Sequence, residues 1–290
     1  MRRALKWFLP VVVLVEAALI WSGELGFGDA LLVVAAIEGL LLLVGVSQML
    51  LVFRRYRGGR RAGLGPWEAL EGGLELVSPR PVARLAVSEP RLFVCLARWA
   101  FGRGRLREDE FGYGKGSPLG MLVVMVVLTA PIEVVFWELL VPWSWLRWVL
   151  LFLSVYSVLW LLGLYASRVK LPHRLEEDGV RLRQGLFAEV FVPYAEVEDL
   201  EKKRRKAPKD GDGLRSSPEG DAAFLAINGR VDLALALVSP LTVRGFLRDT
   251  GPVGTIYFAA NEPEKMLRVL RRRLEGAPAA GPTATSPVSP

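Results

Sequence analysis

The chain has 290 residues, of which 52% are hydrophobic, and its formal net charge at neutral pH is +7. This length predicts about two domains, and the apolar excess predicts that one lies in a membrane. One cysteine, Cys95, and one histidine, His173, exclude an internal disulfide framework and a zinc site built from several cysteines and histidines. Few groups remain for acid–base chemistry, so the sequence favours a non-enzymatic protein with no catalytic residues, metal or cofactor.

Four segments are apolar and long enough for transmembrane helices, which need about 20 residues. They cover residues 7–22, 30–53, 119–141 and 145–166. The first segment also resembles a signal peptide. Glu16 interrupts its apolar core, however, and Gly23-Glu24-Leu25 is a poor cleavage site, so we expect this segment to be retained.

The clusters of lysine and arginine all fall on one side of these four spans, although the single Arg147 lies just inside the other end of the fourth span. They gather before the first span, within 54–118 and after the last span, whereas the short loops 22–29 and 142–145 contain none. By the positive-inside rule, we expect both termini to be cytoplasmic. Abundant arginine, alanine, glycine, valine and leucine resemble the codon bias of a GC-rich bacterial genome, so we expect the membrane to be a bacterial plasma membrane. The distribution of basic residues accounts for the net charge without a nucleic-acid partner. The opposite boundary carries an aromatic belt: Trp21, Trp137, Trp143, Trp145 and Trp148.

The sequence therefore divides into five parts. A first transmembrane helix pair covers 1–53, and a second pair covers 119–166. Between them, 54–118 is a cytoplasmic loop with amphipathic helices. A cytoplasmic domain covers 167–275, and a disordered tail covers 276–290, which is rich in proline, alanine, serine and threonine.

The cytoplasmic loop contains two stretches with helical spacing of apolar residues. One extends from Pro66 to Val77, although Gly72-Gly73 weakens it. The other is expected to start at Ser88, with Pro90 in its first turn, and to end near Phe101. This second helix either lies on the inner leaflet or packs on the cytoplasmic domain, because its basic amphipathic pattern suits both.

After Ala166 the pattern changes to the alternation typical of strands. Strands are expected over 180–183, 186–192 and 255–259, and a hairpin is expected with arms 224–227 and 231–238 around Asn228-Gly229. Asn261 then caps a helix with Glu264 at its third position. The expected fold is an antiparallel β-barrel-like domain closed by one C-terminal helix.

Several short segments resemble bacterial multi-pass membrane proteins that carry a pleckstrin-homology-like (PH-like) domain. They are Pro172-His173-Arg174-Leu175, Leu182-Arg183-Gln184-Gly185-Leu186, Val192-Pro193, Ala259-Ala260-Asn261-Glu262-Pro263, Phe111-Gly112-Tyr113 and Pro131-Ile132-Glu133. The resemblance implies a barrel and membrane association, and it brings no catalytic residues. PH-like domains bind lipids, peptides or one another, so the resemblance does not fix the ligand.

A basic run opens the charged segment 201–221, which lies between strands and has little to bury. It consists of Lys202, Lys203, Arg204, Arg205 and Lys206. One interpretation is a contact with anionic lipid, to which each basic residue near the surface contributes about 1 kcal/mol. The other, which we favour, is a solvated hairpin tip.

Several polar residues lie within or at the ends of the predicted spans. Glu16, Glu38 and Glu133 share a depth of roughly 9–12 Å below the outer boundary, on three different helices. The complete set predicted as an intramembrane polar cluster is Glu16, Glu38, Glu133, Glu138, Arg147, Ser154 and Tyr156. Such residues either form a pocket for protons, a cation or an amine, or hydrogen-bond between helices and fix their register.

Three functions fit these features. The leading one is a non-enzymatic membrane protein whose PH-like domain contacts lipids or proteins, in scaffolding, sensing or envelope regulation. The second is a transporter or channel subunit that uses the buried glutamates, and the third is a membrane enzyme acting on lipid. Expected partners are membrane lipids, a second copy of the chain or another membrane protein.

Overall fold

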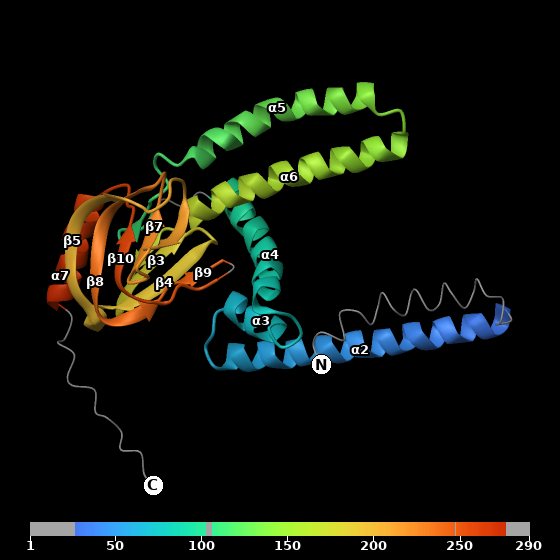
Figure 1. The fold of residues 1–290 in the computed structure, drawn as a ribbon, viewed down its shortest axis with the longest axis horizontal. Coiled ribbons are helices and arrows are strands. Elements are labelled where there is room, and N and C mark those ends of the chain that lie inside the picture. Colours follow the sequence, from blue (N-terminus) through green and yellow to red (C-terminus); the bar gives the residue numbers. More distant parts are fainter. Residues whose placement is uncertain (1–26, 103–105, 247, 277–290) are drawn as a thin grey trace, which may run out of the picture. The chain divides into compact units, whose positions relative to one another are not determined.

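The computed structural model describes residues 27–102, 106–246 and 248–276 (Figure 1). Within these residues, three helical segments are long and apolar enough to cross a membrane: Ala35–Arg61, Pro118–Leu140 and Ser144–Lys170. The first predicted span, with Glu16, lies outside the described residues, as does the tail from residue 277. The chain divides into two compact units, Met1–Pro79 and Arg80–Pro290, which are described separately.

The first unit pairs helix α2 (Phe27–Arg61) with helix α3 (Pro66–Leu74). Helix α2 continues eight residues beyond the predicted span, because Arg54–Arg61 is rich in arginine, a good helix former. Gly73 has a packing role in α3: a Cβ there would lie 2.9 Å from the carbonyl oxygen of Val52. The glycine expected to weaken this helix therefore allows it to approach α2 closely.

The second unit begins with helices α4 (Arg80–Phe101), α5 (Pro118–Leu140) and α6 (Ser144–Lys170). The α5 and α6 bounds confirm two predicted spans to within a few residues, and the two helices form an antiparallel pair (Figure 1). The predicted start of α4 at Ser88 is wrong. The helix begins at Arg80 and includes Pro90, while the Ser88 hydroxyl donates to the Leu85 carbonyl instead of capping.

The remainder of this unit forms two five-stranded sheets. The first sheet has the order β1 (Glu110–Phe111), β2 (His173–Leu175), β3 (Gly179–Gln184), β4 (Ala188–Pro193) and β9 (Arg244–Gly245). The second has the order β5 (Val197–Lys206), β8 (Arg230–Thr242), β10 (Pro252–Phe258), β7 (Ala222–Ala226) and β6 (Gly213–Ser216). A short 3-10 helix, Tyr194–Glu196, connects β4 to β5.

The second sheet corrects three expectations. The Asn228-Gly229 turn forms, with φ of 50° and 67°, but only Ile227 and Arg230 bridge across it. Strand β10 then separates the two arms and pairs in parallel with β7, so the sheet is not wholly antiparallel. Lys202–Lys206 lies within β5 and not in a hairpin tip. Local spacing identifies strands, but long-range pairing decides their neighbours.

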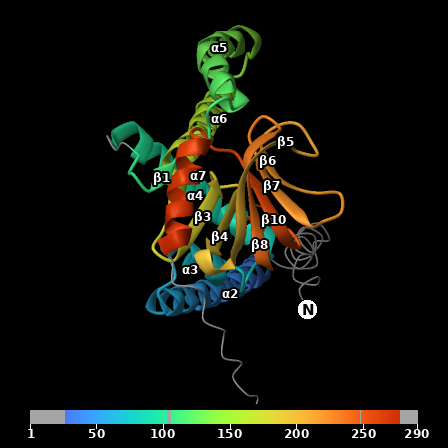
Figure 2. The ribbon, with the colours of Figure 1, turned by 90° about the vertical axis from the view of Figure 1, so that its left-hand side faces the viewer.

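Both sheets contribute to one hydrophobic core, which helix α7 (Pro263–Gly276) completes. Met266 and Leu270 of α7 are buried together with side chains from both sheets. Helix α7 packs against β5 and β8, and Figure 2 shows it in red along one side of the strands. Phe111 of β1 joins the same core, so the segment before α5 contributes a strand to this domain.

Candidate functional site

The structure brings together two residues of the predicted intramembrane cluster, Glu133 and Ser154. The Ser154 hydroxyl donates to Glu133 Oε1 at 3.1 Å, and the Trp137 indole donates to the same oxygen at 3.3 Å. Glu133 therefore links α5 to α6. Nearer the turn between α5 and α6, Arg147 lies 3.5 Å from Glu138, and both line a pocket of about 320 Å³.

Other members of this predicted cluster lie elsewhere. The Tyr156 hydroxyl donates to Glu89 of α4 and not to a residue of the cluster. Glu38 lies on α2 in the first unit, and Glu16 lies outside the described residues. Convergence of the three carboxylates therefore remains a prediction. Glu89 was not predicted as a partner because Tyr156 and Glu89 are 67 positions apart in the sequence.

Four residues of the basic run have partners inside the domain. Lys202 binds Glu264, which lowers the pKa of that carboxyl, and Lys203 donates to Glu201 at 2.7 Å. Arg204 lies 3.9 Å from Asp232. The Arg205 guanidinium lies 5.6 Å from the centre of the Tyr257 ring, a cation–π distance.

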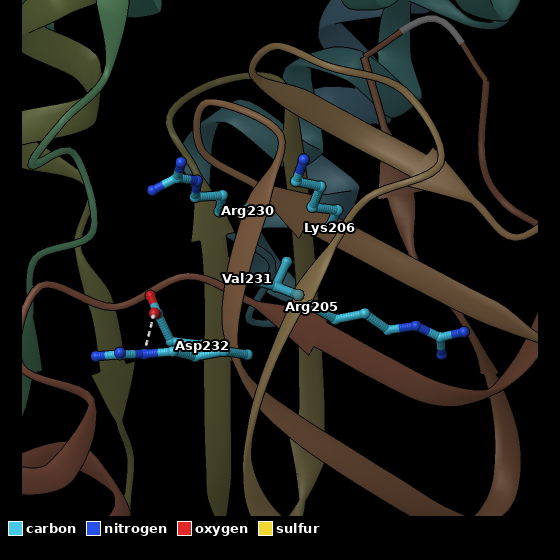
Figure 3. Close-up of a pocket in the computed structure, with 6 residues that line it drawn as sticks. Arg205, Lys206, Arg230, Val231 and Asp232 are labelled. Atoms are coloured by element: carbon cyan, nitrogen blue, oxygen red, sulfur yellow. Dashed lines mark ion pairs between the residues drawn. The ribbon is translucent and has the colours of Figure 1, made fainter.

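Lys206 is different because its cross-strand neighbour is Arg230. Like charges that face each other across a ladder are destabilising. Neither side chain has a carboxylate partner among the described residues, and both line a pocket of about 520 Å³. Figure 3 shows Lys206 and Arg230 on neighbouring strands, with the Arg205 side chain extending away from both. An anion bound between Lys206 and Arg230 would relieve their repulsion.

A buried polar junction fixes this end of the domain against α5 and α6. Ser117, the N-cap of α5, donates to Asp212 at 2.7 Å, and Arg168 of α6 forms an ion pair with the same carboxylate. Asp212 also accepts the Asn228 backbone N–H at 2.6 Å. Burial would raise the pKa of Asp212, but these hydrogen bonds outweigh it and lower the pKa. The turn before Arg230 is thereby held where the two helices enter the domain.

Arg230 also lines a second pocket, of about 230 Å³, together with a further basic residue, Lys115. Lys115 and Asn261 both line it, and Asn261 accepts the Lys115 backbone N–H at 2.8 Å. Lys115 lies three positions before the first residue of α5. We did not single out Arg230 and Lys115 from the sequence. The sequence held one signal for Arg230. It directly follows the Asn-Gly turn, where a residue is expected to lie beside the end of a neighbouring strand.

His173 has a structural role in the core of the domain. Its Nδ1 accepts the Arg183 backbone N–H at 3.0 Å, and its Nε2 lies 2.9 Å from the Ala259 carbonyl oxygen. This pair of partners requires the neutral tautomer with the proton on Nε2. Burial lowers its pKa from 6.5 to about 4. The Tyr113 ring lies beside the imidazole at a centroid distance of 4.6 Å, tilted by 33°.

No family model, curated protein or solved structure matches the chain. Its class is therefore described by fold: the described residues contain three helices that can cross a membrane, followed by a sheet-rich C-terminal region closed by a helix.

Proposed function

We propose that this is a non-enzymatic, four-pass protein of the bacterial plasma membrane, with both termini in the cytoplasm. We further propose that its C-terminal domain is PH-like and binds the headgroups of anionic lipids in the inner leaflet. The paired sheets with a closing helix support the PH-like assignment, as do the short segments that resemble such proteins. The distribution of basic residues supports the orientation.

The observation that carries the lipid assignment is the unpaired Lys206–Arg230 couple beside the inner ends of α5 and α6. Arg230 is two residues from Asn228, whose N–H binds Asp212, and Asp212 binds the N-cap of α5. A pair so close to the start of a span lies at headgroup level. Two basic residues there contribute about 2 kcal/mol to binding of an anionic surface.

The contacts of Glu133 favour a structural role over the transporter alternative. Its two hydrogen bonds join α5 to α6, and interhelical bonds of this kind are worth about 0.6–2 kcal/mol each. This is sufficient to fix helix register. Transport would also need Glu16 and Glu38 at the same site, which is still a prediction.

Native mass spectrometry of the detergent-purified full chain tests the lipid assignment. Phosphatidylglycerol and phosphatidylcholine with the same acyl chains are titrated separately. The parent should retain phosphatidylglycerol preferentially. The double variant Lys206→Ser/Arg230→Ser should bind it about thirtyfold more weakly, which corresponds to about 2 kcal/mol.

Lys203→Ser is the matched control because Lys203 lies on the same strand but is paired with Glu201. It should bind like the parent. Equal affinity for the two lipids, or equal loss in the control and the double variant, would contradict the assignment. If lipid binding is absent but a cytoplasmic protein binds through Lys206 and Arg230, the domain is a protein-interaction module.

A further inference from the structure

The pocket near the turn between α5 and α6 carries both a negative and a positive side chain. Glu138 comes from α5 and Arg147 from α6, and Arg147 Nη1 lies 3.5 Å from Glu138 Oε1. Trp137, Trp148 and Ser144 also line the pocket. Its volume of about 320 Å³ lies at the lower end of the range for small-molecule sites, about 300–1,000 Å³. The pocket is therefore large enough for a small charged group.

The Glu138–Arg147 pair leaves most of its bonding capacity unused. A charge-assisted N–H···O bond is about 2.7–2.9 Å long, so a separation of 3.5 Å is a loose contact. Within the described residues, this contact is the only hydrogen bond or ion pair that either side chain makes. The other N–H donors of Arg147 and the second oxygen of Glu138 therefore remain open to a ligand. Exposed pairs of this kind contribute little to stability, so folding alone does not explain the pair.

The length of the two helices places the pocket at the level of lipid headgroups. Arg147 precedes Lys170, the last residue of α6, by about 23 positions, and Glu138 follows Pro118, the first residue of α5, by about 20 positions. These separations correspond to roughly 30–35 Å of helix, and the hydrocarbon core of a bilayer is about 30 Å thick. The turn lies at the end of the helix pair farthest from the sheets (Figure 1). When α5 and α6 cross a membrane, the pocket therefore lies at the boundary opposite the domain.

The charges of the pocket match a zwitterion. A phosphate group can accept hydrogen bonds from the guanidinium of Arg147, whose planar fork suits phosphate oxygens. A primary ammonium group can donate to the carboxylate of Glu138, and the ring face of Trp148 attracts a cation. A purely anionic group would be repelled by Glu138, and a simple cation would be repelled by Arg147. A group with both charges is favoured by both side chains.

We propose that this pocket binds the phosphoethanolamine headgroup of a phospholipid in the leaflet opposite the domain, with the phosphate on Arg147 and the ammonium on Glu138. A short ethylene link joins the two charges of this headgroup, so a single lipid reaches both side chains. Val134 and Leu151 line the pocket about one helical turn deeper in the membrane, where the acyl chains begin. The proposal goes beyond the anionic-lipid assignment of the domain and requires only that α5 and α6 cross the membrane.

Native mass spectrometry of the detergent-purified full chain tests this site. Phosphatidylethanolamine and phosphatidylcholine with the same acyl chains are titrated separately, and soluble glycerophosphoethanolamine is added as a competitor. Glu138→Gln and Arg147→Gln each remove one charge. Trp148→Ala removes an indole that lines the pocket. Trp145→Ala is its matched control, because Trp145 is similarly exposed but is not among the residues that line the pocket.

The parent should bind phosphatidylethanolamine more tightly than phosphatidylcholine, whose quaternary ammonium cannot donate a hydrogen bond to Glu138. Glu138→Gln and Arg147→Gln should each bind phosphatidylethanolamine about tenfold more weakly, which corresponds to about 1.4 kcal/mol. Trp148→Ala should also bind it more weakly, and Trp145→Ala should bind it like the parent. Equal affinity of the parent for the two lipids, unchanged binding in both charge variants, or equal losses in the two tryptophan variants would overturn the proposal. Displacement of the lipid by an equal concentration of glycerophosphoethanolamine would overturn the lipid as the source of the headgroup.

Two further measurements separate this site from the domain and from the fold. Phosphatidylglycerol binding is assigned to Lys206 and Arg230, so Glu138→Gln should leave it unchanged, and failure of either assignment leaves the other standing. Thermal unfolding of each variant should match that of the parent, because the side chain of Glu138 is 72% exposed and Trp148 is also 72% exposed. A loss of lipid binding at unchanged stability is then a loss of the site itself.

Discussion

The hydrogen bonds of His173 require a neutral imidazole, so the stability of the domain should fall at low pH. Its folded pKa of about 4 lies below its ordinary value of 6.5, so stability is complete above pH 6.5 and falls as pH decreases towards 4. The difference corresponds to about 3 kcal/mol, because one pKa unit is about 1.4 kcal/mol. Protonation would place a second donor on Nδ1, opposite the Arg183 N–H.

Nitrogen NMR of the full chain in micelles, labelled with ¹⁵N-histidine, measures this directly because His173 is the only histidine. We expect two ring-nitrogen resonances, one from protonated Nε2 and one from unprotonated Nδ1, with no titration above pH 5. A midpoint near 6.5 would show that the ring is solvated and that the hydrogen bonds do not hold.

Two substitutions of Glu133 distinguish a structural role of its carboxyl group from a role that needs its charge. Glu133→Gln retains an oxygen that can accept from Ser154 and Trp137, so its stability should match that of the parent. Glu133→Leu leaves both donors without an acceptor and should lower the free energy of unfolding by about 1 kcal/mol. Denaturation in mixed micelles, followed by tryptophan fluorescence, measures both variants. If Glu133→Gln lost as much stability as Glu133→Leu, the result would point to a role for the negative charge of Glu133.

At the scale of elements, the crossing of α4 and α6 depends on Gly163. A methyl group there would collide with Leu92, so Gly163→Ala should destabilise the pair by about 1–3 kcal/mol. Gly120→Ala on α5 is the matched control, because its Cβ would meet only Tyr165 at an ordinary 3.5 Å. Thermal unfolding of both variants checks this. Restoration of stability by adding Leu92→Ala to Gly163→Ala would attribute the loss to this contact.

Elements with strong local signals were predicted well from the sequence. The apolar runs predicted α5 and α6, and the strand patterns predicted β3, β4 and β10. The helix predicted from Asn261 is α7, but it begins at Pro263, and the Asn261 side chain accepts the Lys115 N–H instead of capping it. Strand β5 was missed because its exposed end carries Lys202–Lys206, which has the composition of a loop. Backbone pairing with β8 keeps this segment extended, and that pairing is set by the whole sheet.

The candidate site was predicted only in part, for the same reason. The basic run was visible in the sequence, but the Arg230 that faces Lys206 belongs to a different strand. Ser154 was expected near Glu133 because depth along two adjacent helices follows from residue counting. The Tyr156–Glu89 contact depends on where α4 crosses α6, which residue counting does not give.

At the scale of the whole molecule, Asp212 connects the spans to the domain. Its side chain and that of Arg168 are only 10% and 9% exposed. Removing one charge of such a pair typically costs about 3–5 kcal/mol. Asp212→Asn should therefore increase hydrogen exchange in the first turn of α5 and around Asn228.

Asp221→Asn is the control for this junction. Asp221 accepts a hydrogen bond from the Ser217 hydroxyl at 2.5 Å in the β6–β7 loop and, within the described residues, makes no hydrogen bond or ion pair with α5 or α6. Hydrogen-exchange mass spectrometry of the full chain in nanodiscs should show changes near residue 221 only. Exchange at α5 that is unchanged in Asp212→Asn would mean that the domain does not depend on this junction.

The account as a whole requires that the C-terminal domain and the loop before α5 face the cytoplasm. Reporter fusions after Gly26, Gly59, Trp143 and Pro290 measure this most directly. Using paired reporters that are active only outside or only inside the cytoplasm, we expect the order outside, inside, outside, inside. An outside result at Gly59 or Pro290 would contradict the topology and with it the contact of Lys206 and Arg230 with the inner leaflet.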